Sequence, residues 1–222
     1  LPYNISTPLL FHLLDQGARV ILASHLGRPD GKVQDGLRLR PTAERLSGLL
    51  RVSVPCTGDA LGQGTEDAVR RLKPGEILLL ENLRFHPEEE KNDPAFAKAL
   101  ASYADAYVND AFGTAHRAHA STHGIAQILP AYAGFLMERE ITYLSRLVED
   151  PERPYAAIIG GAKVSDKIKV LANLLNKVDI LIVGGGMANT FLLAQGKAVG
   201  KSLAEPDRVE DAQRIMAAAE AA

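Results

Sequence analysis

Short apolar runs alternate with amphipathic segments along the first half of the chain. Runs at 19–24, 76–81 and 106–108 are bounded by polar or turn residues, a pattern typical of buried strands. Apolar residues spaced three and four apart predict a helix at 8–16. The other elements expected in this half are helices at 41–50, 65–72 and 94–102 and a short strand at 51–55. Alternation of strands and helices specifies a parallel sheet with helices on its faces.

The character of the chain changes at 134–150. Met137, Ile141, Leu144 and Val148 follow helical spacing while charged residues fill the other positions, which predicts a long amphipathic helix. From this pattern alone, the helix either covers the first sheet or joins two domains.

Two further strands are expected after this helix, at 155–159 and 179–183, and each runs into a glycine-rich turn and a helix. The helices are expected from 166 and at 187–195, and an alanine-rich helix begins near Pro206. The second half of the chain therefore also has the strand and helix order of a parallel α/β sheet.

Composition excludes several classes of protein. The 222 residues carry a net charge of -2, which argues against a nucleic-acid surface, and the longest apolar runs are far too short to span a bilayer. No secretory signal is visible at the start of the sequence. Cys56 is the single cysteine, so an intramolecular disulfide is excluded and a reducing cytoplasm is expected. We expect a protein that binds neither nucleic acid nor membrane.

Three of the predicted strands are each followed by an arginine with histidines nearby. Arg28 follows the first strand in His25-Leu26-Gly27-Arg28, Arg84 follows the second, and Arg117 follows the third between His116 and His119. Carboxyl ends of parallel strands meet at one edge of a sheet, where ligands bind. Guanidinium groups bind carboxylate and phosphate oxygens in pairs, so three of them predict a small anionic, phosphorylated ligand. The alternative is that each arginine pairs with a local carboxylate such as Asp30, Glu88 or Asp110.

The two glycine turns suggest a second anionic ligand. Gly160 and Gly161 precede Lys163 and Lys167, and Gly184, Gly185 and Gly186 precede a helix. Glycine lets a polyphosphate approach the backbone, and a helix start offers free N–H groups and a positive dipole. Tight turns need glycine in any case, and neither segment is a Walker A motif. The two lysines favour phosphate binding at the first turn.

One charged run receives no chemical role. Glu88-Glu-Glu-Lys91 is interpreted as a solvated loop between a strand and a helix. We interpret His86 and His123 as exposed or hydrogen-bonded residues and His12 as structural.

Five segments of the chain resemble those of the phosphoglycerate kinase family, in the same order. They are His25-Leu-Gly-Arg-Pro29, Leu80-Glu-Asn-Leu-Arg-Phe85, the stretch 107–121, Ile159-Gly-Gly-Ala-Lys-Val-Ser-Asp-Lys-Ile168 and Gly184-Gly-Gly-Met-Ala188. The resemblance covers 8–222 and leaves out the first seven residues. It implies an α/β fold with two Rossmann-like parallel-sheet domains joined by a long helix. The domains implied are a substrate domain at 1–133, an interdomain helix at 134–150 and an incomplete nucleotide domain at 151–222.

The family's reaction is reversible phosphoryl transfer between ATP or ADP, with Mg²⁺, and the carboxylate of 3-phosphoglycerate, giving 1,3-bisphosphoglycerate in glycolysis. By resemblance, the substrate-binding residues are His25, Leu26, Gly27, Arg28, Arg84 and Arg117. The nucleotide-binding residues are Gly160, Gly161, Lys163, Lys167, Gly185 and Gly186, and the catalytic residues are Lys163 and Arg117. No protein ligand of the metal falls in this sequence, and a cytoplasmic monomer is expected.

The sequence also departs from the family pattern. It lacks the family's first strand and most of the nucleotide domain, and the family's arginine on the first helix falls on Pro2. We therefore expect this chain to be inactive alone. A non-catalytic module that binds an anion such as phosphoglycerate is the alternative. An unrelated sugar-phosphate or dinucleotide enzyme is disfavoured because the glycine turns lack G-x-G-x-x-G spacing.

Overall fold

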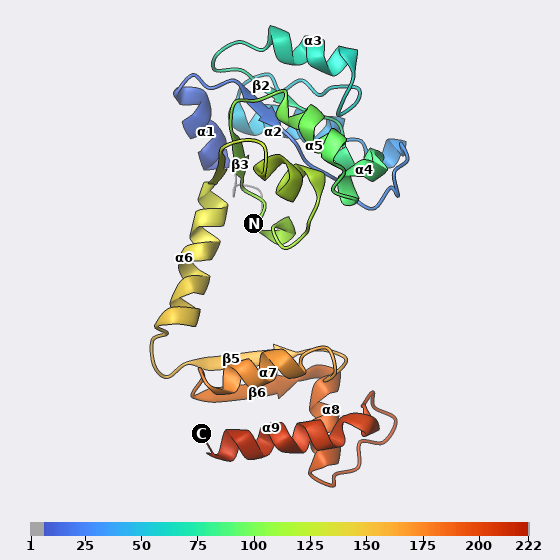
Figure 1. The fold of residues 1–222 in the computed structure, drawn as a ribbon, viewed down its shortest axis with the longest axis vertical. Helices are drawn as coiled ribbons and strands as arrows, with labels where there is room; N and C mark the ends of the chain where they lie inside the picture. The colour runs from blue at the N-terminus through green and yellow to red at the C-terminus, as the bar shows by residue number, and fades with distance from the viewer. Residues whose placement is uncertain (1–6, 222) are drawn as a thin grey trace. The chain divides into compact units, whose positions relative to one another are not determined.

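The computed structural model describes residues 7–221 and divides the chain into two compact units (Figure 1). The units are Leu1–Thr142 and Tyr143–Ala222, and the division falls within helix α6 (Phe135–Glu149). A long helix is therefore present where the sequence predicts one at 134–150. Both units are α/β with parallel strand pairing, as expected.

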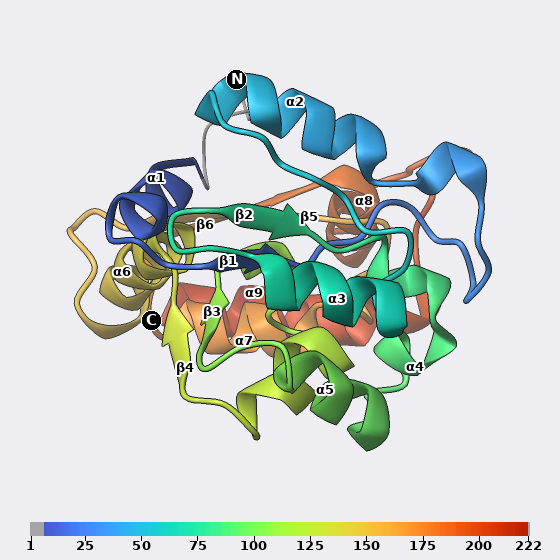
Figure 2. The same ribbon diagram turned by 90° about the horizontal axis from the view of Figure 1, so that it is seen from above.

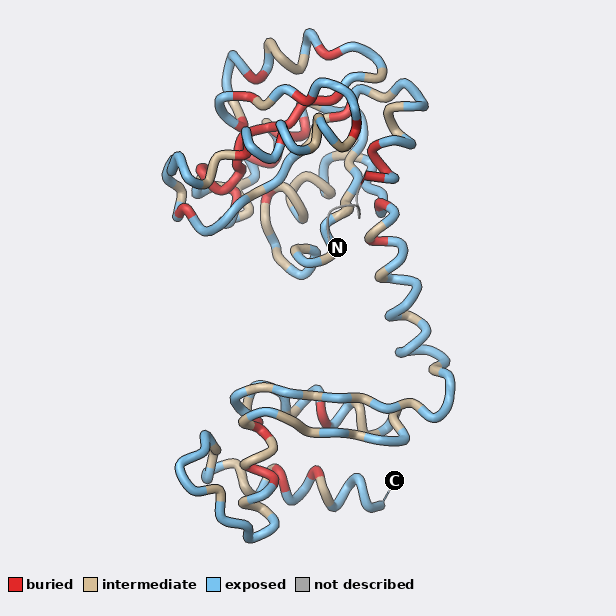
Figure 3. The backbone as a smooth tube through the Cα atoms, turned by 180° about the vertical axis from the view of Figure 1, so that it is seen from behind, coloured by how far each residue is buried: buried red, intermediate tan, exposed pale blue. Residues whose placement is uncertain are grey.

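The first ladder of unit 1 joins β1 (Val20–Leu22) to β2 (Ile77–Leu79) in parallel, with Val20 opposite Ile77. Helices α1 (Thr7–Asp15), α2 (Arg40–Leu50) and α3 (Gln63–Arg71) belong to the same region (Figure 2). The first apolar cluster of the unit consists of Leu10, Val20, Leu39, Ala43, Leu50, Val54, Ile77 and Leu79. It joins α1 and α2 to both strands, so β2 is buried along its whole length (Figure 3).

A second ladder in unit 1 joins β3 (Tyr107–Asn109) to β4 (Ala131–Ala133), also in parallel. The expectation that the strands at 19–24, 76–81 and 106–108 form one sheet is wrong for the described residues, because no ladder there connects β3 to β1 or β2. The ladder between β1 and β2 spans three residue pairs. On its other side, β2 bonds to the 55–57 segment, where the N–H of Thr57 donates to the Leu79 carbonyl at 2.9 Å and the N–H of Glu81 donates to Thr57 Oγ1 at 3.0 Å.

Two predicted elements of unit 1 need correction. The strand expected at 51–55 does not form; Arg51 ends α2 with a positive φ of 57°, and Cys56 makes a single bridge to Leu79. The run at Glu88–Lys91 is not a solvated loop, because α4 (Pro87–Glu90) forms there and Glu89 is only 3% exposed. Proline and three glutamates favour the first turn of a helix, where the dipole is positive.

Helix α5 (Pro94–Ala101) begins as the sequence predicts. Asp93 caps it by accepting hydrogen bonds from the N–H groups of Ala95 and Phe96, both at 2.9 Å. A second apolar cluster joins this helix to the segments that follow β2 and to the start of the 120–124 turn. Its members are Ala60, Leu80, Leu83, Phe96, Ala97, Leu100 and Ala120.

After α6, the described residues of unit 2 form one ladder and three α-helices. β5 (Ala156–Gly160) pairs in parallel with β6 (Ile180–Gly184), and the helices are α7 (Ile168–Leu175), α8 (Gly185–Ala194) and α9 (Val209–Ala221). The core consists of Val164, Leu171, Met187, Phe191, Ala212 and Ile215, with Ile159, Leu181 and Val183 packed against it. The alternate strand residues Ile158, Ile180 and Ile182 are 74%, 50% and 47% exposed.

Unequal burial of the two faces of this ladder gives a first prediction. Leu171→Ala removes a side chain that is fully buried, so unit 2 should lose about 2–5 kcal/mol of unfolding free energy. Ile158→Thr changes an exposed position and should cost no more than about 0.5 kcal/mol. Hydrogen exchange of the β5 and β6 amides measures both. Similar losses in the two variants would contradict the one-sided core.

Candidate functional site

The loop after β1 carries the first predicted site residues, and its shape is fixed by backbone carbonyls. The carbonyl of Leu26 accepts a hydrogen bond from Asn82 Nδ2 at 2.9 Å, and that of Gly27 accepts one from Arg84 Nη1 at 3.0 Å. Gly27 has a φ of 67°, and a Cβ there would lie 2.7 Å from Leu37 Cδ2. Glycine is therefore needed for the loop itself, apart from any ligand.

Two buried polar side chains at the end of β2 hold this loop, and the sequence analysis gave them no role. Asn82 is fully buried and also donates to the carbonyl of Leu37 at 2.9 Å, while its Oδ1 accepts from the N–H of Arg84. Glu81 accepts two N–H groups, from Leu39 and Asn82, both at 2.8 Å. The available signal was their position: polar residues directly after a buried strand.

Arg84 has a structural role as well as a possible binding role. Its side chain is buried, with Nη1 bonded to Gly27 and Nε 3.2 Å from Glu90 Oε1. This pair lacks hydrogen-bond geometry, and Nε has no hydrogen-bond partner among residues 7–221. Pairing with a local carboxylate was the alternative for all three arginines, but the partner is Glu90 rather than Glu88. Arg84 therefore supports the loop of His25 and keeps donor capacity.

The segment after β3 presents Arg117. Its backbone N–H donates to Thr114 at 2.9 Å, and its carbonyl accepts from Thr122 Oγ1 at 2.9 Å. Among the described residues, no ion pair or hydrogen bond engages its guanidinium. A hollow of about 300 Å³ is lined by Asn109, Ala115, His116, Arg117, Ala118, Thr122, His123 and Ala126. Arg117 therefore stands beside an open space with its charge available.

The electrostatics of His25 connect three of the predicted segments. Burial lowers the pKa of His25, and the nearby charges of Arg84, Arg117 and His119 lower it further. His25, Arg84 and Arg117 follow β1, β2 and β3 respectively, and the two arginines are close enough for their charges to act on His25. Arg28 is exposed and has no ion pair among the described residues.

The glycines at the strand ends of unit 2 are of two kinds, those that close packing requires and those that it does not. Gly185 has a φ of 66° and its added Cβ would lie 2.9 Å from the carbonyl oxygen of Gly161, while a Cβ on Gly186 would lie 2.8 Å from that of Ala162. Met187 donates its N–H to the Gly161 carbonyl at 3.0 Å. Close packing of the 160–163 turn on α8 therefore requires the second pair of glycines.

Gly160 and Gly184 are different. They are opposite each other in the ladder, and no described atom lies within 4 Å of a Cβ on Gly184, while Gly160 would meet only Gly184 backbone at 3.9 Å. Their φ values lie outside the left-handed region, so neither backbone strain nor packing requires glycine. The ends of β5 and β6 are therefore open, and Gly184 is not among the nucleotide-binding residues that the family resemblance implies.

The two predicted lysines lie next to this open end. Lys163 and Lys167 are exposed and form no ion pair among the described residues, and the N–H of Lys167 donates to Val164. Between them, Ser165 donates its hydroxyl and its N–H to Glu205, at 2.7 and 3.1 Å. The hydrogen bond from Ser165 lowers the pKa of Glu205, and the charge of Lys163 contributes. The turn that carries both lysines is therefore anchored.

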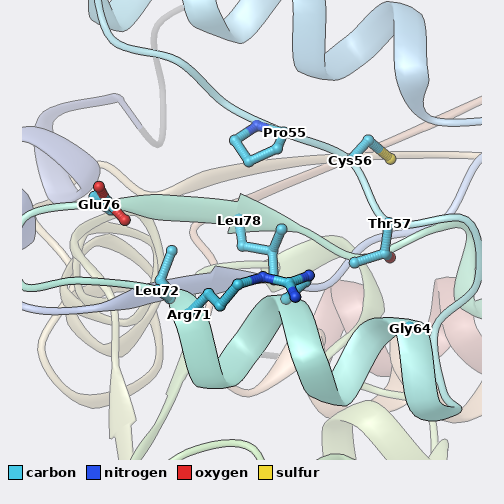
Figure 4. A pocket seen from close by; sticks show the side chains of 9 residues that line it. Pro55, Cys56, Thr57, Gly64, Arg71, Leu72, Glu76 and Leu78 are labelled. Carbon is cyan, nitrogen blue, oxygen red and sulfur yellow. The ribbon is translucent and has the colours of Figure 1, made fainter.

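A larger hollow lies elsewhere in unit 1. It has a volume of about 410 Å³ and is lined by Pro55, Cys56, Thr57, Gly64, Ala68, Arg71, Leu72, Glu76 and Leu78 (Figure 4). Burial and the charge of Glu81 raise the pKa of Cys56 to about 11, so its thiol is not an activated nucleophile. Neither Arg84 nor Arg117 lines this hollow.

Across 7–221, no group of three or more His, Cys, Asp or Glu could hold a metal ion. No helix within that range is long and apolar enough to cross a membrane.

The sequence matches one protein family over almost its whole length. The family model described as phosphoglycerate kinase matches residues 4–222. The phosphoglycerate kinases of Moorella thermoacetica and Desulforudis audaxviator are 65% and 61% identical over 209 and 212 residues, which is 94% and 96% of this chain. Each alignment covers about half of the relative, 53% and 54%.

Solved structures give the same result for the fold. Phosphoglycerate kinase from Coxiella burnetii has a TM-score of 0.85 at 44% identity and is matched over 97% of this chain and 54% of its own. The enzyme from Pyrococcus horikoshii has a TM-score of 0.82 at 36% identity, over 96% of this chain and 56% of its own. The chain spans about half the length of its relatives, and it belongs to the phosphoglycerate kinase family.

Proposed function

We propose that this chain binds 3-phosphoglycerate on unit 1 and an adenine nucleotide on unit 2, as part of a phosphoglycerate kinase. The reaction is phosphoryl transfer between ATP and the carboxylate of 3-phosphoglycerate. The observation that carries the proposal is Arg117, which lines a hollow of about 300 Å³ and whose guanidinium has no ion pair or hydrogen bond among the described residues. In support, the charges of Arg84, Arg117 and His119 lower the pKa of His25, after burial. Positive charge at strand ends suits a ligand with a phosphate and a carboxylate.

Each residue of unit 1 has a distinct part in this proposal. Arg117, whose guanidinium forms no ion pair among residues 7–221, binds anionic oxygens of the ligand and supports the developing charge. Arg84 binds with its remaining donors while it holds the loop that contains Leu26 and Gly27. Arg28 is exposed, and its contact with the ligand remains a prediction from the sequence. His25 becomes protonated more readily when an anion arrives.

The open strand ends of unit 2 fit a nucleotide. Gly160 and Gly184 leave room that a Cβ would fill, and Gly184 is the N-cap of α8, with no side-chain hydrogen bond at the cap. Backbone N–H groups and the helix dipole favour a polyphosphate there. Lys163 and Lys167 add positive charge, and in this proposal Lys163 stabilises the transferring group. The remaining assigned glycines, 161, 185 and 186, shape the turn.

The transfer itself needs no covalent enzyme intermediate. In-line positioning and neutralisation of charge on the equatorial oxygens are the main requirements. Magnesium bound to the nucleotide phosphates supplies further positive charge during transfer. Location in the cytoplasm and a monomeric state remain predictions from the sequence.

The second candidate is a non-catalytic module that binds the same anion. Pro2, at the position of the family's arginine, favours it, although this residue lies outside the described range. Calorimetric titration with 3-phosphoglycerate tests the binding that both candidates require, and a coupled ATPase assay tests for turnover, which only the kinase allows. We expect the 222-residue chain to bind without turnover. Turnover would reject the module, and absence of binding would reject both candidates.

The first binding prediction concerns Arg117. Arg117→Ala should weaken 3-phosphoglycerate binding by about 1.5–3 kcal/mol, the range for hydrogen bonds to charged groups, with little loss of stability. Arg84→Ala should weaken binding similarly and also lower the unfolding free energy, because Gly27 loses its donor. Calorimetry and urea unfolding measure the two effects. Arg45→Ala, an exposed arginine on α2, is the control. Equal affinity in all three variants would reject the site.

The second prediction separates the two kinds of glycine. Gly184→Ala has room for its methyl group, so unit 2 should fold normally while its affinity for MgADP falls about tenfold, or 1.4 kcal/mol. Gly186→Ala should instead destabilise unit 2, because its methyl group would meet the Ala162 carbonyl. Thermal unfolding and calorimetric titration with MgADP distinguish these outcomes. Unchanged MgADP affinity in the folded Gly184→Ala variant would show that the nucleotide does not use the open strand ends.

The third prediction concerns the titration of His25. Arg117→Ala removes a nearby positive charge, so the pKa of His25 should rise towards its ordinary value, and 3-phosphoglycerate should raise it in the unaltered chain. A lowered pKa means that the unfolded chain binds the proton first as pH falls. Stability linked to His25 is therefore lost between the ordinary value of 6.5 and the lower folded value. Ring-proton NMR titration measures these shifts; identical curves would separate His25 from Arg117.

A further inference from the structure

A buried carboxylate accepts hydrogen bonds from the segment that carries Arg117. Glu89, on α4, is 3% exposed and accepts two hydrogen bonds from Ser121. The Ser121 hydroxyl donates to Oε1 at 2.6 Å, and the Ser121 N–H donates to Oε2 at 3.0 Å. Both oxygens of one carboxylate are therefore committed to one residue that lies 32 positions later in the chain.

The residue after Ser121 is hydrogen-bonded to the backbone of both Arg117 and His119. This residue, Thr122, donates from Oγ1 to the carbonyl of Arg117 at 2.9 Å, and the same oxygen accepts the N–H of His119 at 3.2 Å. These residues lie next to and within a π-helical turn, Ala120–Gly124. An anchor on Ser121 therefore fixes the backbone at both Arg117 and His119.

Glu89 also faces His119 directly. Its Oε1 lies 3.7 Å from His119 Nδ1, and both side chains are largely buried, at 5% and 13% exposed. The charge of His119 is one of the causes that lower the pKa of His25. Burial and the charge of Glu89 raise the pKa of Tyr107 to about 12, which places the carboxylate near β3 as well. Glu89 is thus buried against the segment that carries His119.

The turn lies closely against α5 and the segment between α4 and α5. A Cβ on Gly124 would lie 2.8 Å from both Ala97 Cβ and Asn92 Oδ1, so the backbone has no room to shift in that direction. Burying a carboxylate costs several kcal/mol before its partners compensate, and apolar contacts often stabilise a fold equally well. Specific orientation of the partners is the advantage that a buried charge offers.

We propose that Glu89 is a positioning residue for the proposed phosphoglycerate site. Through its hydrogen bonds to Ser121, Glu89 fixes the positions of Arg117 and His119. The ligand-binding part of this inference rests on the proposed function. The clamp, by which we mean the hydrogen bonds between Glu89 and Ser121, does not rest on the proposed function, because it predicts the arrangement of His119 and Arg117 around His25 without any ligand.

Glu89→Gln tests the clamp with little change in shape, since the amide can still bond to Ser121 but carries no charge. We expect about tenfold weaker 3-phosphoglycerate binding, faster exchange of the Ser121 amide and a rise in the pKa of His25 towards 6.5. Glu88→Gln is the matched control: it removes the same charge from the same helix, and its side chain forms no hydrogen bond among the described residues. It should leave all three measurements unchanged.

Ser121→Ala removes only the hydroxyl donor. It provides a second test of the clamp if Glu89→Gln does not fold. It should shift the same three measurements as Glu89→Gln does, and the double variant should be no worse than the more severe single one, because both break one link. A His25 pKa and a 3-phosphoglycerate affinity that stay unchanged in folded Glu89→Gln would overturn the proposal. If the unaltered chain binds no 3-phosphoglycerate, the proposed function fails; a shifted His25 pKa would still support the clamp and an unshifted one would overturn it.

Discussion

Peptide groups that leave a buried strand need new hydrogen-bond partners, and in this protein carboxylate and amide side chains provide them. Glu81 and Asn82 satisfy backbone groups at the end of β2, including the loop that follows β1. Asp110 at the end of β3 accepts the N–H of Leu136 at 2.7 Å and so supports the start of α6. An unsatisfied buried peptide group costs as much as a lost hydrogen bond, so these side chains determine where each loop can lie.

The same device occurs in both units. Ser121 of unit 1 and Ser165 of unit 2 each donate a hydroxyl and an N–H to the two oxygens of a distant glutamate, Glu89 and Glu205. Each serine lies within four residues of a proposed binding cation. The two glutamates thus bind the serines of these loops, while Arg117 and Lys163 in the same loops form no ion pair among the described residues. This division of roles produces positive surfaces in a chain whose net charge is -2.

Glycine has two different functions at the strand ends of unit 2. Gly185 and Gly186 allow the 160–163 turn to pack on α8, so the fold explains why these two residues are glycines. Gly160 and Gly184 have no such explanation among the described atoms and leave an opening above the ladder. A glycine that packing does not require is better evidence for a ligand than one that it does require, because only the former needs another cause.

The sequence by itself determined the α/β class, most helices and the family, and it indicated the segments of the candidate site, because periodicity and ordered motifs are local properties. It could not determine that Glu89 is buried, since a run of glutamates looks solvated until Ser121 and His119 arrive from another part of the chain. Nor could it separate Arg84, which is bonded inside the fold, from Arg28, which is exposed. Burial and partner choice depend on residues distant in sequence, so only the tertiary structure decided them.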